Sequence, residues 1–243
     1  MRTEVAARLY VGSEVGTLRR VVLHRPDLEL KRLTPRNKDA LLFDDVLWVK
    51  RARQEHDAFA DALADRGVEV LYLQELLAEV LEQPAVRDEV IARTLADVDL
   101  GPDLGPEVAA WLKSVSAVEL AERLIGGITY EELPFTSHAL SAQVPAVDGF
   151  VLAPLPNHLF TRDTSAWIYD GVSINAMAKP ARRRESIHYD AIYRHHPAFA
   201  GATIWSDDLG GQAQLEGGDV LVIGNGCLLI GMGERTRPAP VER

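Results

Sequence analysis

The fold of this chain is decided by the stretch Ser165-Ala166-Trp167-Ile168-Tyr169-Asp170-Gly171-Val172-Ser173-Ile174-Asn175. Apolar and β-branched residues fill both of its halves, as strands require. The dipeptide Asp170-Gly171 between the halves tolerates the positive φ of a type I′ turn. The stretch therefore predicts a β-hairpin with strands at 165–169 and 172–175.

The segments that follow continue this pattern. Residues 183–195 are predicted to form a helix, and residues 203–205 a strand. A second hairpin is predicted at 220–231, where Asn225-Gly226 separates two aliphatic runs. The succession of hairpin, helix, strand and hairpin predicts a weak structural repeat without evident sequence identity.

The N-terminal part predicts a strand–helix–strand unit. Aliphatic strands are expected at 18–24 and 68–73. Between them, apolar or small residues recur at a spacing near 3.6 over 48–65, and Gly67 follows as a natural C-cap, so this segment is predicted to be a helix. The chain therefore begins as an α/β protein.

Residues 75–133 consist mainly of helix formers and predict a small helical insert. The segment Ser116-Ala117-Val118-Glu119 has the capping-box pattern expected at the start of a helix. The dipeptides Gly101-Pro102 and Gly105-Pro106 are expected to separate the helical pieces.

Composition narrows the classes of function. The 243 residues are 47% hydrophobic, enough for a buried core, and carry a formal charge of -10 at pH 7. This acidity disfavours nucleic acid and membrane as partners, because both require a concentrated basic face. The single cysteine, Cys227, excludes a disulfide framework and a cysteine-based metal cluster. We also expect no metal or other cofactor. No run resembles a membrane span or a secretory signal, so we expect a cytoplasmic protein.

Two polar stretches stand out because they place carboxylates where a strand meets a turn. One is Asn157-His158-Leu159-Phe160-Thr161-Arg162-Asp163, and the other is Glu216-Gly217-Gly218-Asp219-Val220. Acidic residues have no propensity to begin aliphatic strands, and paired glycines let a backbone pass close to a ligand. By spacing alone, the glycines could equally mark a β-bulge and Asp163 could cap a turn. Arg182 and Arg235 are further candidates, although each could belong to a solvated charge run or a surface loop.

In combination, these segments resemble the arginine deiminase family in order and approximate spacing. The polar motifs that carry the resemblance are Leu155-Pro156-Asn157 through Asp163, Ala176-Met177 to Arg184-Glu185, Glu216-Gly217-Gly218-Asp219-Val220 and Gly233-Glu234-Arg235-Thr236. Motifs of the N-terminal part that also resemble the family are Ser13-Glu14-Val15-Gly16, Leu23-His24-Arg25-Pro26, Leu42-Phe43-Asp44-Asp45, Glu55-His56-Asp57-Ala58-Phe59 and residues 67–73. The segment Leu124-Ile125-Gly126-Gly127-Ile128-Thr129 resembles the end of the family's helical insertion. The resemblance covers essentially the whole chain.

The resemblance implies the pentein fold, an α/β propeller of five ββαβ-type modules around a polar channel, with a helical insertion after the first module. On this basis, residues 1–79 and 135–243 are expected to form an incomplete α/β propeller core, and residues 80–134 the helical insert. An incomplete ring would leave a strand edge and apolar faces uncovered, so a homo-oligomer is expected.

The resemblance also implies hydrolysis of the guanidinium group of free L-arginine to citrulline and ammonia. In the family, a cysteine thiolate attacks the guanidinium carbon, and water then hydrolyses the amidino-thioether. Asp163 and Glu216 match the catalytic carboxylates that clamp the planar cation, and Glu216 also matches the group that passes protons. Arg182 and Arg235 match the arginines that bind the substrate carboxylate.

Three further residues match substrate-binding positions of the family. Asn157 corresponds to a polar helper, Phe160 to an apolar wall over the substrate stem, and Asp219 to another carboxylate of the site.

The chain departs from the family pattern in one respect. It ends shortly after Thr236, and the His-x-Asp pair and nucleophilic cysteine of the family are missing from it. Cys227 does not match the cysteine motif and is expected to be a small core residue. We therefore expect the chain to be part of a longer enzyme and to be inactive by itself.

Two alternatives stay open at this point. The chain could be another guanidine-modifying enzyme, such as a dimethylarginine hydrolase or an amidinotransferase, although residues 124–129 favour the deiminase. It could also be a non-catalytic module that binds arginine.

Overall fold

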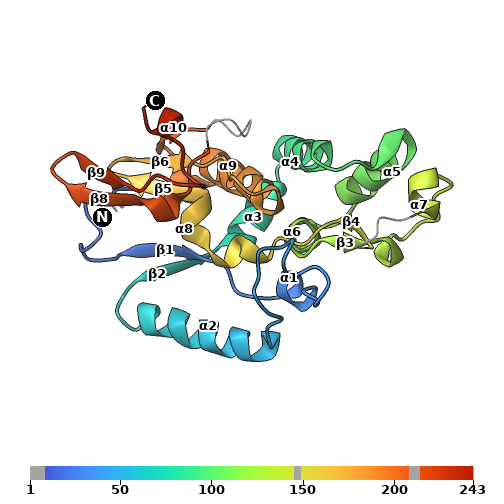
Figure 1. Cartoon of the computed structure of the whole chain (residues 1–243), viewed down its shortest axis with the longest axis horizontal. Helices are drawn as coiled ribbons and strands as arrows, with labels where there is room; N and C mark the ends of the chain where they lie inside the picture. Colours follow the sequence, from blue (N-terminus) through green and yellow to red (C-terminus); the bar gives the residue numbers. More distant parts are fainter. Residues whose placement is uncertain (1–8, 145–148, 208–213, 243) are drawn as a thin grey trace, which may run out of the picture. The chain divides into compact units, whose positions relative to one another are not determined.

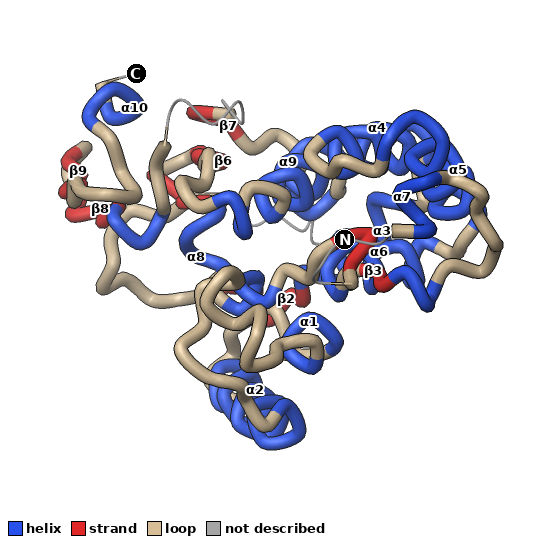
Figure 2. The backbone as a smooth tube through the Cα atoms, turned by 45° about the vertical axis from the view of Figure 1, so that its right-hand side comes forward, coloured by secondary structure: helices blue, strands red, loops and turns tan. Residues whose placement is uncertain are grey.

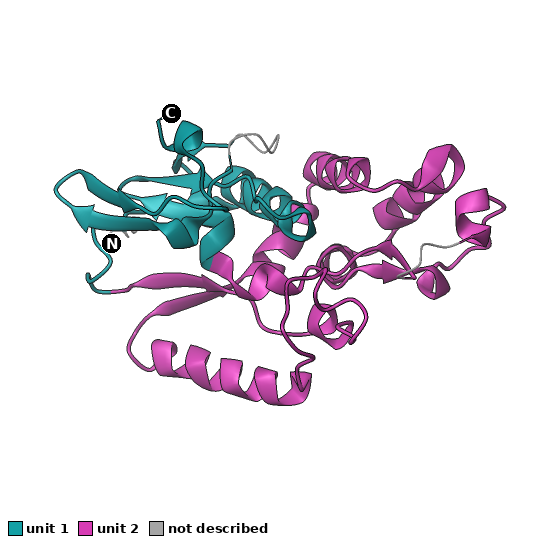
Figure 3. Cartoon of the chain, viewed as in Figure 1, with its two compact units in different colours: residues 1–17, 162–243 teal, residues 18–161 magenta. Residues whose placement is uncertain are grey.

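A computed structural model describes residues 9–144, 149–207 and 214–242. The chain divides into two compact units (Figure 3), of which unit 1 comprises residues 1–17 and 162–243 and unit 2 comprises residues 18–161. Over the described residues the structure is mixed α/β, with four small sheets and no closed barrel. The α/β class is confirmed, whereas the propeller and its division into core and insert stay predictions.

Unit 2 begins with the strand–helix–strand arrangement that the sequence predicts. Strand β1 (Arg20–Leu23) pairs in parallel with β2 (Glu69–Tyr72), and Arg20 lies opposite Glu69. A parallel pair needs a long crossover, which α1 (Leu28–Lys31) and α2 (Val49–Ala64) provide (Figure 1). Gly67 follows α2 with a φ of +78°, a conformation that glycine adopts without strain.

Helices make up much of the rest of unit 2 (Figure 2). They are α3 (Leu73–Leu81), α4 (Pro84–Ala96), α5 (Gly101–Ser114), α6 (Ala117–Gly126) and the short α7 (Leu140–Gln143). Helices α3 and α6 pack against each other through fully buried leucines, among them Leu77 and Leu124. Strand β3 (Ile128–Thr129) leads into a short 3-10 turn (Tyr130–Glu132) and pairs antiparallel with β4 (Phe150–Leu152).

The start of α6 is confirmed as a cap, because the Ser116 side chain accepts a hydrogen bond from the Glu119 backbone N–H at 3.1 Å. The prediction that the Gly-Pro dipeptides separate helical pieces is confirmed for Gly101-Pro102, which begins α5 after the end of α4. It is wrong for Gly105-Pro106, because Pro106 is an interior residue of α5. Burial of Leu104 and Val108 from the same helix offsets the loss of a backbone donor at the proline.

Unit 1 is built around a three-stranded sheet. Its strands are β5 (Ser165–Ile168), β6 (Gly171–Ile174) and β7 (Thr203–Ser206), with β5 antiparallel and β7 parallel to β6. The crossover from β6 to β7 runs through a 3-10 turn η3 (Pro180–Arg182), helix α9 (Glu185–His195) and a second 3-10 turn (Pro197–Phe199). The predicted hairpin, helix and strand are therefore confirmed in this order.

The two hairpin turns of unit 1 differ from each other. In the second hairpin, β8 (Val220–Gly224) and β9 (Cys227–Ile230) are joined by Asn225 and Gly226, both with positive φ, as a type I′ turn requires. In the first hairpin, the positive φ is at Tyr169 and not at Asp170 or Gly171, so the prediction of a type I′ turn centred on Asp170-Gly171 is wrong. Gly171 belongs to β6 and is needed for packing, because a Cβ there would lie 2.6 Å from the Thr203 carbonyl oxygen.

The core of unit 1 forms between its sheet and α9. The rings of Trp167 and Tyr193 meet edge to face at 5.6 Å, and Phe199 lies 4.9 Å from Tyr193. A final short helix, α10 (Pro238–Val241), follows β9. Across the described residues, none of the helices has the length and apolar character needed to cross a bilayer.

Candidate functional site

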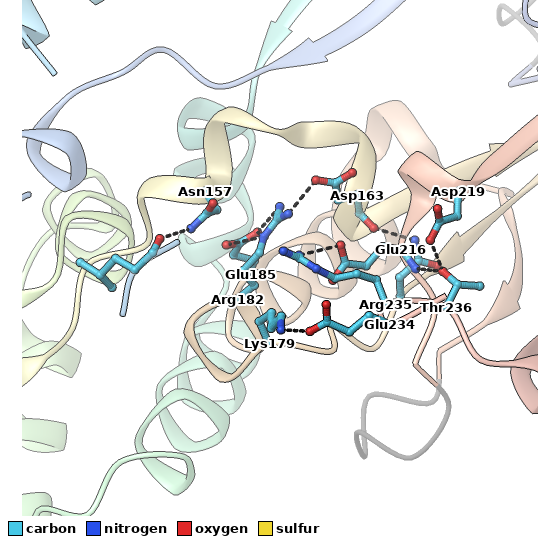
Figure 4. A network of polar contacts seen from close by, with 12 residues as sticks. Asn157, Asp163, Lys179, Arg182, Glu185, Glu216, Asp219, Glu234, Arg235 and Thr236 are labelled. Atoms are coloured by element: carbon cyan, nitrogen blue, oxygen red, sulfur yellow. Dashed lines mark hydrogen bonds and ion pairs between the residues drawn. The ribbon is translucent and has the colours of Figure 1, made fainter. Parts of the chain in front are cut away.

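Four segments of unit 1 each contribute a charged residue to one polar network (Figure 4). Asp163 lies in the short helix α8 (Thr161–Thr164), directly before β5. Arg182 ends η3, and Glu216 precedes the 3-10 turn η5 (Gly217–Asp219) that leads into β8. Arg235 follows β9. The first three positions lie where a short helix or 3-10 turn begins or ends, and Arg235 lies in the segment between β9 and α10. Tertiary packing brings the four segments together.

Arg182 links two carboxylates. Its Nη1 donates to Asp163 Oδ2 at 2.6 Å, while its Nη2 and Nε donate to Glu185 Oε2 at 2.9 and 3.1 Å. Arg182 is 3% exposed and Glu185 is completely buried, whereas the Asp163 side chain keeps 24% of its surface. Asp163 is therefore the member of this trio that is accessible to a ligand.

Burial and charge act in opposite directions on this trio. Burial raises the pKa of Glu185 to about 7, although Arg182 works against that rise. Burial also disfavours the charge on Arg182, but the Glu185 and Asp163 carboxylates outweigh it and raise the pKa of Arg182. The negative charges of Asp163 and Glu216 add to the rise in the pKa of Glu185.

Glu216 forms the second ion pair of the network. Arg235 Nη1 donates to its Oε2 at 3.0 Å and to its Oε1 at 3.2 Å. Glu216 is 6% exposed, while the Arg235 side chain is about one-third exposed. Each of the two predicted clamps thus accepts hydrogen bonds from a guanidinium, the group that carboxylates pair with most strongly.

Thr236 connects Glu216 with Asp219. Its hydroxyl donates to Asp219 Oδ2 at 2.5 Å and accepts a hydrogen bond from the Glu216 backbone N–H at 3.1 Å. Thr236 is fully buried, so this hydroxyl is held in one place. Asp219 is therefore fixed next to the segment that presents Glu216.

The two glycines after Glu216 allow a close approach to α8. A Cβ on Gly217 would lie 2.0 Å from the Arg162 carbonyl oxygen, and one on Gly218 would lie 2.8 Å from Asp163 Oδ1. Both glycines belong to η5 and precede the paired part of β8. The alternative of a β-bulge is therefore wrong, and the glycines serve to bring the Glu216 segment next to Asp163.

Asn157 and Phe160 belong to unit 2 and have their own contacts there. Asn157 lies in a 3-10 turn (Pro156–Leu159), is buried, and donates through Nδ2 to the Leu41 carbonyl oxygen at 2.8 Å. The Phe160 ring is about half exposed and lies 6.3 Å from the Phe43 ring. Among the seven predicted site residues, unit 1 brings together Asp163, Arg182, Glu216, Asp219 and Arg235.

Sequence reasoning missed three buried residues of the network, namely Asn175, Glu185 and Thr236. Asn175 donates through Nδ2 to the Asp163 carbonyl oxygen at 2.8 Å, which fixes the backbone of the clamp. Asp163 and Glu216 were predicted because a polar residue borders an aliphatic strand. The same signal is present at Asn175, directly after a strand, and could have identified it. Glu185 had no such signal, because it follows three arginines and has the pattern of a surface charge run.

Cys227 does not lie in the core, so that prediction is wrong. Its side chain is exposed, at the turn of the second hairpin. Asp219 precedes the opposite end of this hairpin, where Val220 pairs with Ile230. At about 3.4 Å per residue along a strand, this separates the thiol from Asp219 by on the order of 10 Å.

Within the described part of the chain, no group of three or more histidine, cysteine, aspartate or glutamate side chains is placed to hold a metal ion. The network instead alternates carboxylates and guanidiniums, an arrangement suited to an organic cation.

A comparison with protein families gives a match to the family described as arginine deiminase, over residues 39–243. This match covers most of the chain, including every residue of the network. The chain belongs to the arginine deiminase family.

Proposed function

We propose that unit 1 binds L-arginine, with Asp163 and Glu216 holding its guanidinium group and with Arg182 and Arg235 holding its carboxylate. The observation that carries this proposal is that both carboxylates accept guanidinium hydrogen bonds, at 2.6 Å on Asp163 and at 3.0 and 3.2 Å on Glu216. These contacts support both carboxylates as partners of a substrate guanidinium.

The balance of charge supports the same ligand. The five site residues of unit 1 comprise three carboxylates (Asp163, Glu216 and Asp219) and two guanidiniums (Arg182 and Arg235). With these five ionised, the negative charges exceed the positive charges by one, and by two when Glu185, which pairs with Arg182, is also ionised. Free arginine, with two positive groups and one negative group, complements this excess.

Binding of arginine in this arrangement exchanges ion pairs within the protein for ion pairs with the ligand. The substrate guanidinium takes the place of Arg182 on Asp163 and of Arg235 on Glu216, and the substrate carboxylate then accepts from the N–H groups that this exchange frees on the two arginines. The number of charge-assisted hydrogen bonds is preserved, so binding does not leave a buried charge without a partner.

The reaction we propose is that of the family, hydrolysis to citrulline and ammonia through a thiolate. The two clamps polarise the guanidinium carbon, and Glu216 transfers protons in both half-reactions. Cys227 is not assigned as the nucleophile, because it is exposed at the far end of the hairpin.

Calorimetric titration with L-arginine tests the binding step. We expect the wild-type protein to bind and Asp163→Asn to bind about tenfold or more weakly, the loss typical of a charged hydrogen-bond partner. Asp170→Asn, which removes an exposed carboxylate from the turn between β5 and β6, is the control and should bind like the wild type. Failure of the wild type to bind, or equal binding by Asp163→Asn, would refute the proposal.

A non-catalytic arginine-binding module is the second candidate, and the exposed position of Cys227 favours it over catalysis by this thiol. Binding of arginine without release of citrulline would support it. Turnover that is lost in Cys227→Ser would contradict both this alternative and the assignment of Cys227 as a bystander. A cytoplasmic location and a homo-oligomer stay predictions.

A further inference from the structure

We propose that Glu185 is a positioning residue that fixes Arg182 for the ligand carboxylate and thereby makes the site selective for ligands that carry one. This inference rests on the function proposed above, and it assigns a role to a side chain that does not itself contact the substrate.

The Arg182 guanidinium is held along one edge. Glu185 takes its Nε–Nη2 edge, with hydrogen bonds of 3.1 and 2.9 Å to Oε2 and one of 3.2 Å from Nε to Oε1. The Nη1 group donates instead to Asp163 at 2.6 Å. A guanidinium is a planar fork, so holding one edge fixes the direction of the remaining N–H groups.

Binding of a ligand guanidinium would change the partner of Asp163. When Asp163 pairs with the guanidinium of a ligand, Arg182 loses that contact while it stays almost fully buried. A buried cation without a partner is strongly unfavourable, and Glu185 is the carboxylate that remains beside it. Glu185 therefore lets Asp163 change partners without releasing Arg182 from its position.

Glu185 belongs to a buried helix that holds it in place. Glu185 is the first residue of α9, an eleven-residue helix whose residues 185–193 are all buried. The neighbouring Ser186 hydroxyl donates to the Asn175 carbonyl oxygen at 2.6 Å, and the Asn175 side chain donates to the backbone of Asp163. The start of α9 is thereby tied to the segment that presents Asp163, and a carboxylate held in this way keeps its partner within a narrow range of orientations.

The test compares two ligands that differ only in the carboxylate. L-arginine and its decarboxylated analogue agmatine are titrated by calorimetry at pH 8 into the wild type and Glu185→Gln. We expect Glu185→Gln to bind arginine about tenfold or more weakly, and agmatine within about twofold of the wild type, because agmatine has no group for Arg182 to bind. The preference for arginine over agmatine should therefore fall by about the same tenfold factor.

Glu69→Gln is the matched control, because it removes one charge and one glutamate–arginine pair from an exposed position of unit 2. It should leave both affinities unchanged. Equal weakening of arginine and agmatine by Glu185→Gln, or no change in either affinity, overturns the positioning role.

Thermal melting establishes whether each variant is folded. If Glu185→Gln does not fold, Glu185→Asp decides, because it keeps the charge and withdraws the carboxylate by one methylene. A lowered preference for arginine in Glu185→Asp supports the role, and an unchanged preference overturns it. Failure of the wild type to bind arginine at all refutes instead the proposed function on which this inference rests.

Discussion

At the scale of single residues, the polar network of unit 1 includes buried side chains that hold its charged residues in place. Thr236 joins Glu216 to Asp219 through one hydroxyl, and Asn175 holds the backbone of Asp163. Buried hydrogen-bond partners of this kind restrict the positions of the charged groups, so they decide how well the site is organised before a ligand arrives.

The Thr236 hydroxyl allows a direct test of this role. We expect Thr236→Val to lower the free energy of unfolding by about 1–3 kcal/mol, because it leaves the buried Glu216 N–H without its acceptor. Thr236→Ser keeps the hydroxyl and should lose less. Urea unfolding of the three proteins measures the difference, and equal stability of Thr236→Val and Thr236→Ser would contradict the assignment.

The raised pKa of Glu185 predicts how the stability of the protein depends on pH. In the folded protein its pKa is raised to about 7, above its ordinary value of 4.5. Between these values the folded state binds a proton that the unfolded chain has released, so the contribution of this carboxyl to stability falls as pH rises and is fully lost above about pH 7.

Glu185→Gln cannot ionise, so its stability should lack this dependence. We expect the free energy of unfolding of the wild type, minus that of Glu185→Gln, to decrease from pH 5 to pH 8. Urea titrations at intervals across this range measure the difference, and a difference that is constant or rises with pH would show that burial does not raise the pKa.

At the scale of elements, the junction between η5 and β8 determines how close Glu216 and Asp163 come to each other. Gly217→Ala should destabilise the protein by about 2–3 kcal/mol or more, because the new methyl group would meet the Arg162 carbonyl oxygen, a backbone atom that cannot easily move. Gly233→Ala is the control, since no atom lies within 4 Å of the added Cβ, and its effect should stay within about 0.5 kcal/mol. Thermal unfolding measures both, and equal effects would contradict the close approach.

The position of Cys227 in the second hairpin predicts that its thiol is accessible to reagents. Because Cys227 is exposed at the turn, a thiol reagent should label the native protein in a ratio of one to one. Labelling, or Cys227→Ser, should leave the affinity for arginine within about twofold of the wild type, since the thiol lies on the order of 10 Å from Asp219. Loss of binding after labelling would place the thiol in the site.

At the scale of the whole molecule, the formal charge of -10 favours a cationic ligand. We expect the affinity for arginine to fall severalfold when the salt concentration rises from about 50 to 500 mM, because salt screens long-range attraction. Citrulline, which has the same amino-acid end and no net charge, should change much less. Calorimetry at both salt concentrations measures this, and an equal response of the two ligands would show that the protein's overall charge plays no part.

The sequence predicted the elements well wherever local pattern controls them. Both hairpins, the parallel strand–helix–strand unit and the helix before β7 are present close to the predicted bounds. The errors lie where packing outweighs local preference: Pro106 stays inside α5 because its neighbours are buried, and Gly171 is required by its contact with β7 rather than by the turn.

The sequence by itself determined the α/β class, the family and the charged residues that make up the candidate site. It could not show that each clamp pairs with an arginine of the chain, or that Glu185 is buried. Alternating patterns and turn residues act over a few positions, whereas Asp163 and Arg182 are 19 residues apart and meet only after the sheet and α9 have packed. Whether a charge in an arginine-rich run faces solvent or a buried partner is a property of the tertiary structure, because burial sets the cost of leaving that charge unpaired.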